Sequence, residues 1–598
     1  MNNKFHNIVK TSTILYLSLP IFLFLIGWLN PTFSILASCA LIIGCVLFIR
    51  NKEETQHIEL KWYSVVFGLL LVFLWVYLSG TGGFAYQNSD YSKHNAILRD
   101  LIHYEWPVIY NYSTDYSNSA PLVYYVAYYL PAALAGKLFG WTIANVTMYL
   151  WTVLGVILSL YWLFRIIGKF KLSFILVFIL FSGMDILGGI LIDKSLPNLS
   201  DHLEWWAKVL QQYPSFTTLL FWVPQHAISG WLFTSLLVYN SWVSKESKFN
   251  VFIVALSSLW SPFVMIGLLP LLFLSFFSVK SYKALFSVSN ILSASVLLFF
   301  IGFYYLAGSG AVSSNTGWIW NHIDFLEVWP NLALLYVLEF GLLFILLYRK
   351  SLEHKIWLFV AVFYMSIVPI YIVGGNNDFG TRSIIPSLLV LFIFLISSLK
   401  QASSKVRSSL LVLLLIIGTV TPIMEISRTL TKHNQSSDGW FTIFNTPEDY
   451  RNQYIGKPTS FFLNYLAKDD SNRAVNPVEF TLEMGNWSPY GMNATFDVNN
   501  FEVIAEDKVD AGLLLSKHFE KGTYLLKAVI SGKAENVHIS QYGIHKIIDI
   551  PLLNGEMEVF GLLRVNDFSE GTLVFGLGGW GTGIGETKLE ELIVYKWN

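Results

Sequence analysis

The hydrophobic positions of the chain are gathered in long apolar runs that short polar stretches separate. A helix needs about 20 apolar residues to cross the hydrocarbon core of a bilayer, so these runs predict membrane spans. The predicted spans lie near residues 11–28, 32–49, 62–79, 141–166, 172–191, 227–243, 284–306, 329–348, 356–373, 383–399 and 409–425. One more apolar region, 249–279, is interrupted by Trp260-Ser261-Pro262, which indicates either one kinked span or a hairpin of two short helices.

The distribution of Lys and Arg between the loops favours the hairpin. Cytoplasmic loops of membrane proteins carry an excess of these two residues. With a hairpin at 249–279, the basic residues gather on one side, as in Arg50, Lys52, Lys61, Arg165, Lys169, Lys171, Lys245, Lys248, Lys280, Lys283, Arg349, Lys350, Lys355, Lys400, Lys405 and Arg407. We therefore predict about 13 membrane helices in the plasma membrane, with the N-terminus in the cytoplasm.

Two further segments do not fit the pattern of spans. Residues 120–138 are apolar but contain Pro121 and Pro131, and we expect them to lie in the outer membrane interface with their tyrosines at headgroup level. Beyond residue 426 the chain turns polar and, from Phe501, shows short alternating runs that turn residues separate, which is typical of a β-sandwich.

The predicted fold class is a polytopic α-helical membrane protein with a C-terminal extracytoplasmic β-sandwich. Its expected parts are an N-terminal two-helix hairpin, a transmembrane domain with a long outer loop at 80–140, a connecting subdomain and the sandwich, at residues 1–61, 62–426, 427–500 and 501–598.

Composition supports the membrane class and excludes others. Of the 598 residues, 54% are hydrophobic and only 13% are charged, against about 25% charged in soluble proteins. The formal net charge of −1 argues against nucleic acid as a partner. The two cysteines, Cys39 and Cys45, share one apolar run, so they predict neither a disulfide framework nor a zinc site.

The loop that follows the span at 62–79 carries the first candidate chemistry. Glycines at its start allow tight turns, and Ser89 stands where a helix N-cap would be. Asp90, Lys93 and His94 then follow at helical spacing, so they can share one helix face. Ile97, Leu98, Leu101 and Ile102 complete an amphipathic pattern, which predicts a helix along the membrane surface.

Three other polar clusters fall on the same predicted side. They comprise Asp185 near the outer end of its span; His202, Glu204, Trp205, Trp206, Gln225 and His226 in the loop 192–226; and Asn376, Asn377, Asp378 and Arg382 between two spans. Each has a structural alternative: acids at helix starts, interfacial histidines, tryptophan anchors and an arginine that reaches headgroups. The hypothesis of a site rests on the shared side of the membrane.

Carboxylates that face basic groups suit the transfer of a group from a lipid-linked phosphate. A carboxylate can take the proton of an attacking hydroxyl, and an arginine can bind the leaving phosphate with two hydrogen bonds. The chain contains no GxxxxGK[ST] loop, which argues against an ATP-driven pump.

The sequence resembles the GT-C superfamily of integral-membrane glycosyltransferases in the segments NSDYSKHNAILRDL and PLVYYVAYYLPAALAGKLFG. The resemblance covers roughly residues 62–425. It implies a polyprenyl-phosphate-linked sugar donor and an extracytoplasmic glycan, wall polymer or glycolipid acceptor, with Asp90 as the catalytic residue, assisted by His94. Arg382 is expected to bind the phosphate, with Lys93. Asp185 matches a second acidic position that is sometimes a metal ligand.

The chain departs from that superfamily in two respects. It has an additional hairpin at 11–49, and Asp185 is not part of a DxD or ExD pair, so a divalent cation stays an open alternative and no other cofactor is expected. Gln225, His226, Asn377, Asp378, Trp205 and Glu204 are the remaining candidate substrate-binding residues. A transporter or flippase of lipid-linked glycans, or a polysaccharide polymerase, is the competing hypothesis for function.

Overall fold

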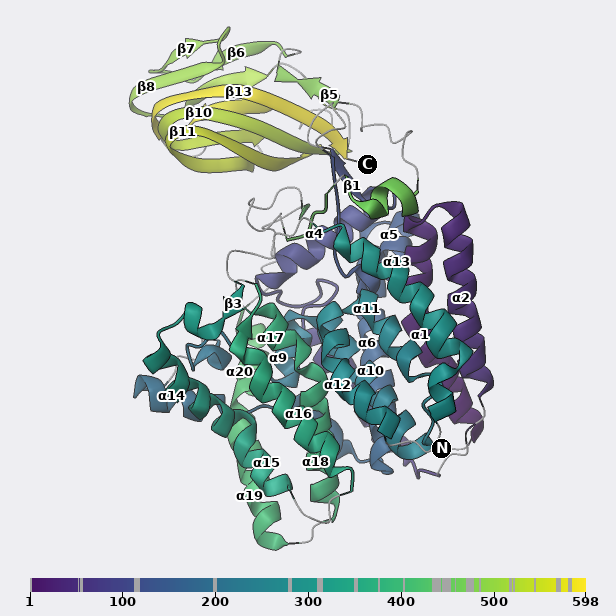
Figure 1. The fold of residues 1–598 in the computed structure, drawn as a ribbon. Helices are drawn as coiled ribbons and strands as arrows, with labels where there is room; N and C mark the ends of the chain where they lie inside the picture. Colours follow the sequence, from purple (N-terminus) through teal and green to yellow (C-terminus); the bar gives the residue numbers. More distant parts are fainter. Residues whose placement is uncertain are drawn as a thin grey trace. The chain divides into compact units, whose positions relative to one another are not determined.

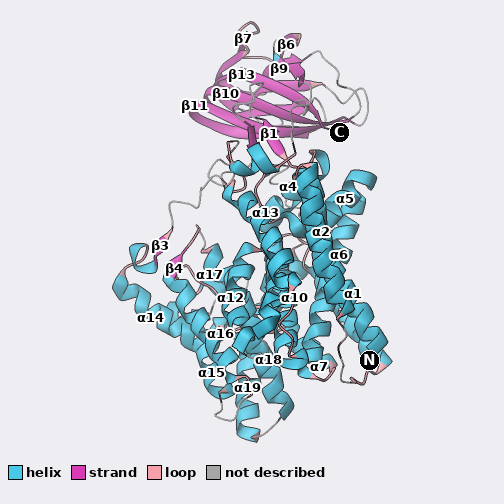
Figure 2. Ribbon diagram, turned by 45° about the vertical axis from the view of Figure 1, so that its right-hand side comes forward, coloured by secondary structure: helices cyan, strands magenta, loops and turns pink. Residues whose placement is uncertain are grey.

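The computed structural model divides into two compact units, which comprise Met1–Tyr110 with Ser117–Asp469 and Asn111–Tyr116 with Asp470–Asn598. The described residues are 3–51, 53, 57–111, 119–196, 202–277, 282–308, 316–348, 353–374, 377–401, 404–432, 442–443, 453–457, 459–468, 478–482, 485–515, 519, 522–541, 545–565, 572–578 and 583–597. The first unit is helical and the second is built of strands (Figures 1 and 2).

The helical unit contains the long apolar helices. Its helices are α1 Asn3–Trp28, α2 Pro31–Arg50, α3 Trp62–Leu78, α4 Asp90–His103, α5 Leu130–Phe139, α6 Trp141–Ile167, α7 Leu172–Ile179, α8 Asp185–Asp193, α9 Phe216–Trp222, α10 Pro224–Tyr239, α11 Asn250–Trp260, α12 Pro262–Phe277, α13 Ala294–Leu306, α14 Phe325–Tyr336, α15 Leu342–Leu347, α16 Lys355–Ile367, α17 Asp378–Ser383, α18 Ile385–Gln401, α19 Lys405–Gly418 and α20 Val420–Thr431. Short helical turns and two small two-stranded ladders, β1–β2 (Ile109–Asn111, Ser119–Pro121) and β3–β4 (Gly317–Trp318, Tyr371–Ile372), connect them.

Seven helices of the described part are long and apolar enough to cross a membrane. They are Asn3–Trp28, Pro31–Arg50, Trp141–Ile167, Ser289–Leu306, Val328–Leu347, Asp378–Gln401 and Lys405–Thr431. Shorter apolar helices, among them α3 and α12, accompany them. By length and composition these helices indicate a membrane protein, whereas the expected number of about 13 spans is not confirmed.

Helix α10 forms the centre of the helical unit. Every residue from Pro224 to Tyr239 is buried, as expected for a helix that is apolar on all sides. It packs against α6, α11, α12 and α18. Gln225 and His226 lie in its first turn, so the packing of this helix fixes the positions of these two candidate residues.

The apolar region 249–279 forms a hairpin, as the charge pattern predicts. Helices α11 and α12 meet at Ser261, where the backbone is extended. The side-chain amide of Asn250, at the start of α11, donates to Ser275 Oγ near the end of α12 at 3.1 Å. Because the first helix begins where the second ends, the two run antiparallel.

The predicted span 172–191 is divided. Residues 180–184 separate α7 from α8, so one continuous helix is the wrong description. Gly183 lies in this break against Glu339, and an added Cβ there would stand 1.7 Å from Glu339 Oε2. Glu339 itself sits in a π-helical turn, η8 (Val337–Gly341), and such turns re-aim side chains in helices.

Helix α4 is amphipathic as predicted, with Ile97, Leu98, Leu101 and Ile102 buried. A further acid, Asp100, anchors it from the buried side. Asp100 Oδ2 accepts from Tyr110 Oη at 2.5 Å and from the backbone N–H of Ile443 at 2.9 Å. The helix is thus tied to a segment more than 300 residues later in the chain.

The second unit contains one nine-stranded sheet with the strand order β6-β9-β12-β10-β13-β8-β7, to which β11 and β5 add by pairing with β10 and β13. The strands are β5 Val478–Thr481, β6 Trp487–Tyr490, β7 Thr495–Asp497, β8 Glu502–Val509, β9 Ala511–Leu515, β10 Gly522–Gln541, β11 His545–Val565, β12 Leu573–Leu577 and β13 Gly583–Trp597. The sheet begins before residue 501, within the stretch expected to form a connecting subdomain.

The sequence predicts a β-sandwich, in which two sheets pack face to face. The structure instead has one continuous sheet. Strand β10 pairs with β11 over its length, with β13 along its first half and with β12 near its end. A strand that changes partners belongs to both layers, so the sheet curls towards a barrel instead of splitting in two. Register shifts at Gly532/Ala534 and beyond supply the bend.

We predict that Asp100→Asn makes the thermal stability of the protein less dependent on pH. Burial raises the pKa of Asp100 to about 7, against the lowering effect of the hydrogen bond from Tyr110. The carboxyl of Asp100 therefore keeps its proton to a higher pH in the folded state than in the unfolded state. Its contribution to stability falls as the pH rises from about 4 to about 7. Asparagine keeps an acceptor for Tyr110 and Ile443 without the proton, so the variant should unfold several degrees higher at pH 7 and above.

The measurement is the unfolding temperature of the detergent-solubilised protein between pH 4 and pH 9. Asp193→Asn, at a carboxylate that is 45% exposed, is the matched control. Parallel pH profiles of Asp100→Asn and the unsubstituted protein would contradict the prediction.

Candidate functional site

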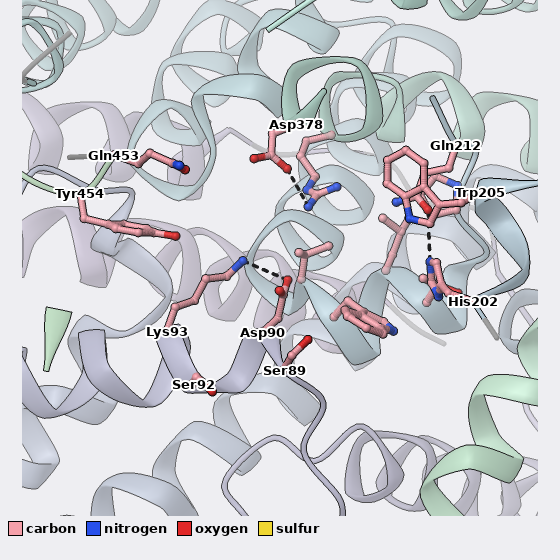
Figure 3. A pocket seen from close by; sticks show the side chains of 16 residues that line it. Ser89, Asp90, Ser92, Lys93, His202, Trp205, Gln212, Asp378, Gln453 and Tyr454 are labelled. Atoms are coloured by element: carbon pink, nitrogen blue, oxygen red, sulfur yellow. Dashed lines mark hydrogen bonds and ion pairs between the residues drawn. The ribbon is translucent and has the colours of Figure 1, made fainter. Parts of the chain in front are cut away.

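A polar cavity of about 740 Å³ lies in the helical unit, and Asp90, Lys93, Trp205, Asp378 and Arg382 of the predicted site residues line it. Its lining comes from α4, from the loop before α9, from α9 itself, from α17 and from a late segment around residue 454, as Figure 3 shows. The lining residues are Ser89, Asp90, Ser92, Lys93, His202, Trp205, Gln212, Pro214, Thr218, Leu219, Trp222, Val223, Asp378, Arg382, Gln453 and Tyr454.

Asp90 and Lys93 form the first ion pair of the cavity. Asp90 is the first residue of α4, where its charge is favoured by the helix dipole. Its backbone N–H donates to Asn88 Oδ1 at 3.0 Å, so Asn88 caps the helix and the side chain of Ser89, the predicted cap, does not. Lys93 Nζ lies 3.0 Å from Asp90 Oδ2.

Both groups of this pair are charged at neutral pH. Burial on its own would raise the pKa of Asp90, but Lys93 and Arg382 hold it below its ordinary value. Burial would lower the pKa of Lys93, but Asp90, Tyr454 and other neighbours raise it above its ordinary value. The Asp90 side chain is 25% exposed and that of Lys93 is 19% exposed, so a ligand in the cavity can reach both.

Helix α17 supplies the second ion pair. Arg382 lies one turn after Asp378, and its NH2 atom is 3.0 Å from Asp378 Oδ1. The start of this short helix is set by Asn377, which has a positive φ of 50° and accepts from the backbone N–H of Gly380 at 3.1 Å. Asn377 also donates to Gln211 Oε1 at 3.1 Å. It therefore acts as a cap and does not line the cavity.

His202 marks the other end of the cavity and is tied to buried acids. Its Nδ1 is 3.2 Å from Glu425 Oε1 and its Nε2 is 3.5 Å from Glu204 Oε2. Burial lowers the pKa of His202, but the hydrogen bond that it donates to Glu425 and the charge of Glu204 raise it above its ordinary value. Trp222 donates to Glu425 Oε2 at 3.0 Å, which fixes the indole beside the histidine.

A second, aromatic cavity of about 590 Å³ adjoins the first. Six residues line both cavities, and we call them the junction: Lys93, Val223, Asp378, Arg382, Gln453 and Tyr454. The rest of its lining is largely apolar or aromatic, namely Val123, Tyr124, Tyr125, His226, Pro262, Phe263, Tyr305, Leu306, Gly308, Val373, Gly374, Ile455 and Lys457. The charged groups of the site thus stand between a polar and an aromatic compartment.

His94 does not line either of these cavities. Its Nε2 lies 3.0 Å from the carbonyl oxygen of Trp222, which can only accept, so Nε2 carries the proton. Its Nδ1 then accepts from Tyr129 Oη at 2.6 Å. Burial and the nearby Lys93 lower the pKa of His94 to about 4. It is a neutral histidine that joins α4 to α9 and the turn before α5.

The remaining predicted residues lie away from the cavities. Asp185 Oδ2 accepts from Ser182 and Thr421 at 2.9 and 2.7 Å, and Glu339 is a neighbouring buried acid. Glu204 is fully buried and accepts from Ser215 and Thr218. Gln225 is fully buried at the start of α10, and its amide atoms make no hydrogen bond among the described residues.

The structure adds residues that the sequence did not indicate as a site. Gln212, Trp222, Gln453 and Tyr454 line the polar cavity. Trp222 and Gln212 had the same signal as Trp205, because each is a polar or aromatic residue in the predicted loop 192–226. Gln453 and Tyr454 gave no such signal, because they lie more than 20 residues beyond the last apolar helix.

No group of three or more His, Cys, Asp or Glu side chains in the described part of the chain has the geometry of a metal site. In the polar cavity each carboxylate is already paired with a cationic side chain, as in Asp90 with Lys93 and Asp378 with Arg382.

No family model, no curated protein and no solved structure matches the chain.

We predict that Asn377→Ala destabilises the protein. Loss of the side-chain cap costs about 1 kcal/mol, and alanine at a φ of 50° adds strain. Asn377→Asp keeps the cap acceptor and is the matched control. The unfolding temperature in detergent should fall by a few degrees in the alanine variant and less in the aspartate variant; equal stability of all three proteins would contradict the capping role.

Proposed function

We propose that the protein is a GT-C-type membrane glycosyltransferase that moves a sugar from a polyprenyl-phosphate-linked donor to an extracytoplasmic glycan, wall polymer or glycolipid. The observation that carries the proposal is the junction, where Lys93 and Arg382 stand between a polar and an aromatic cavity. A donor of this class has the same order of parts, with an apolar chain, a phosphate and a sugar.

The cations of the junction suit the phosphate. Lys93 and Arg382 each hold one carboxylate of the cavity wall, and a phosphate offers stronger acceptors to both. Arginine binds phosphate with two parallel hydrogen bonds, whereas lysine acts as a compact charge. The polyprenyl chain would occupy the aromatic cavity, beside Tyr124, Tyr125 and Phe263.

Asp90 is the proposed base. The bond between the anomeric carbon and the phosphate oxygen breaks, and its electron pair leaves with the lipid phosphate. The acceptor hydroxyl forms the new bond to that carbon, and its proton passes to the Asp90 carboxylate. When the donor phosphate engages Lys93, Asp90 loses part of its cationic stabilisation, so its pKa rises and it becomes a better base.

The polar cavity suits the acceptor. It exposes the indoles of Trp205 and Trp222 and the amides of Gln212 and Gln453, groups that stack on sugar rings and bind hydroxyls. In this proposal the N-terminus is cytoplasmic, and the cavity and the C-terminal β unit face the outside, which agrees with the charge pattern of the loops.

A proton-coupled transporter of lipid-linked glycans is the competing proposal, and one observation favours it. Asp185 and Glu339 are neighbouring buried acids, and Glu339 lies in an apolar helix long enough to cross a membrane. Acids at such positions are common in proton relays. Transport predicts that substitution of Glu339 abolishes movement of lipid across the bilayer, whereas glycosyl transfer depends on Asp90.

We predict that Asp90→Asn lowers the rate of glycosyl transfer about a thousandfold, because general-base catalysis typically contributes 10²–10⁴. Folding should be unaffected, since the residue is partly exposed and its backbone contact to Asn88 is kept. The assay uses purified protein with membrane lipid-linked sugars and follows the release of polyprenyl phosphate. Asp193→Asn, at an exposed carboxylate outside the cavities, is the control.

Arg382→Gln should raise the KM for the donor more than it lowers kcat, because the phosphate is bound in the ground state and in the transition state. Full activity of Asp90→Asn would remove that residue from the mechanism. If Arg382→Gln binds the donor as tightly as the unsubstituted protein does, Arg382 does not bind the phosphate.

A further inference from the structure

The late segment 453–457, which we call the return segment, builds part of the site although it follows the last apolar helix. The chain leaves the membrane-type helices at Thr431, the end of α20, and comes back to the cavities at Gln453. Gln453 and Tyr454 line both cavities, and Ile455 and Lys457 line the aromatic one. No other stretch beyond α20 contributes to either cavity in the described part of the chain.

Hydrogen bonds on both edges hold the return segment in place. On one edge the backbone N–H of Val123 donates to Tyr454 O at 2.8 Å, and that of Gly456 donates to Pro121 O at 2.7 Å. On the other edge the N–H of Lys457 donates to Ala307 O at 2.7 Å. The segment therefore resembles the middle strand of a small sheet, which makes it a fixed wall.

Its neighbours are themselves anchored to the helices. The hydroxyl of Tyr304, on α13, accepts from the backbone N–H of Tyr124 and donates to the carbonyl oxygen of the same residue, both at 2.8 Å. The ring of Tyr124 lies 5.2 Å from that of Tyr454. Tyr454 is thus packed from behind and is only 7% exposed.

The phenol of Tyr454 is directed towards the charged groups of the junction. Figure 3 shows its phenol pointing towards the Lys93 ammonium, with Gln453 above it and the Asp378 pair opposite. Asp90 and Tyr454 both raise the pKa of Lys93 above its ordinary value. Any molecule that extends from the aromatic cavity into the polar one must pass between this wall and the two ion pairs.

We propose that Gln453 and Tyr454 are substrate-contacting residues that hold the sugar next to the phosphate, with the Tyr454 ring as its platform. The inference rests on the proposed function, because the sugar of a lipid-phosphate donor is the part that lies at the junction. The return segment then determines which sugar fits, while Asp90 and Arg382 carry the chemistry.

The test compares side-chain and backbone changes in the return segment. Tyr454→Ala should raise the donor KM about tenfold, with a smaller effect on kcat, because stacking on an aromatic ring is lost. Tyr454→Phe keeps the ring and should stay within about twofold of the unsubstituted protein. Gln453→Ala removes an exposed side chain and should raise the KM without an effect on folding.

Gly456→Ala displaces the segment without removal of any functional group. An added Cβ would stand 2.6 Å from Ala307 O and 2.6 Å from Val123 Cγ2, so the strand must shift. Gly302→Ala is the matched control, because its Cβ would meet nothing within 4 Å. Tyr465→Ala, at a tyrosine that is 64% exposed, controls for loss of a tyrosine beyond α20. Both controls should behave as the unsubstituted protein does.

Binding of farnesyl phosphate by the full-length protein in detergent, measured alongside transfer, separates the two levels of the proposal. If Asp90→Asn abolishes transfer and Arg382→Gln abolishes binding, while Tyr454→Ala, Gln453→Ala and Gly456→Ala all keep the unsubstituted KM, the return segment is not a substrate wall and the proposed function stands. If Arg382→Gln binds farnesyl phosphate normally and Asp90→Asn transfers normally, the proposed function is wrong and the inference falls with it.

Discussion

The pairing of charges inside an apolar bundle is the constraint on which the site depends. Lys93 and Arg382 are drawn from different helices, and each is held 3.0 Å from one carboxylate. Ionised groups are costly to bury without such partners. The four charges of the two pairs cancel, so the cavity wall carries no net charge from them. Each cation can still bind a ligand whose anionic group is a stronger acceptor than the carboxylate.

The supporting structure serves these two pairs. Asn88 and Asn377 set the first turns of α4 and α17, and Asp100 ties α4 to Ile443. Neutral His94 links α4 to Trp222 and Tyr129. Each of these polar side chains forms hydrogen bonds with the surrounding helices and loops. His94 and Asn377, to which the sequence assigned a chemical role, are therefore structural residues.

The sequence predicted the elements whose signal is local. Apolar runs indicated the membrane helices, the charge of the loops indicated the α11–α12 hairpin, and spacing placed Asp90 and Lys93 on one helix face. The break between α7 and α8 was missed, because a short interruption with Gly183 leaves the hydrophobicity of the run unchanged. Glu339, which packs against Gly183 in the break, lies more than 150 residues away in the chain.

The sequence predicted only part of the site, because only part of its signal is local. Shared location on one face brought Asp90, Lys93, Trp205, Asp378 and Arg382 together correctly. It could not tell a residue that faces the cavity from one that faces the scaffold, as with Asn377 and Asp185. It also could not find Tyr454, whose place depends on backbone pairing between residues far apart in the chain.

The position of the return segment in the chain has a consequence for biosynthesis. A ribosome makes the polypeptide from the N-terminus, and the helices that carry Asp90 and Arg382 are complete long before residue 457 is added. Until then the edges at Pro121–Val123 and Ala307 have no middle strand. The cavity wall is therefore closed only after all the apolar helices have been made, so a nascent chain in the membrane carries the charged pairs but not the finished site.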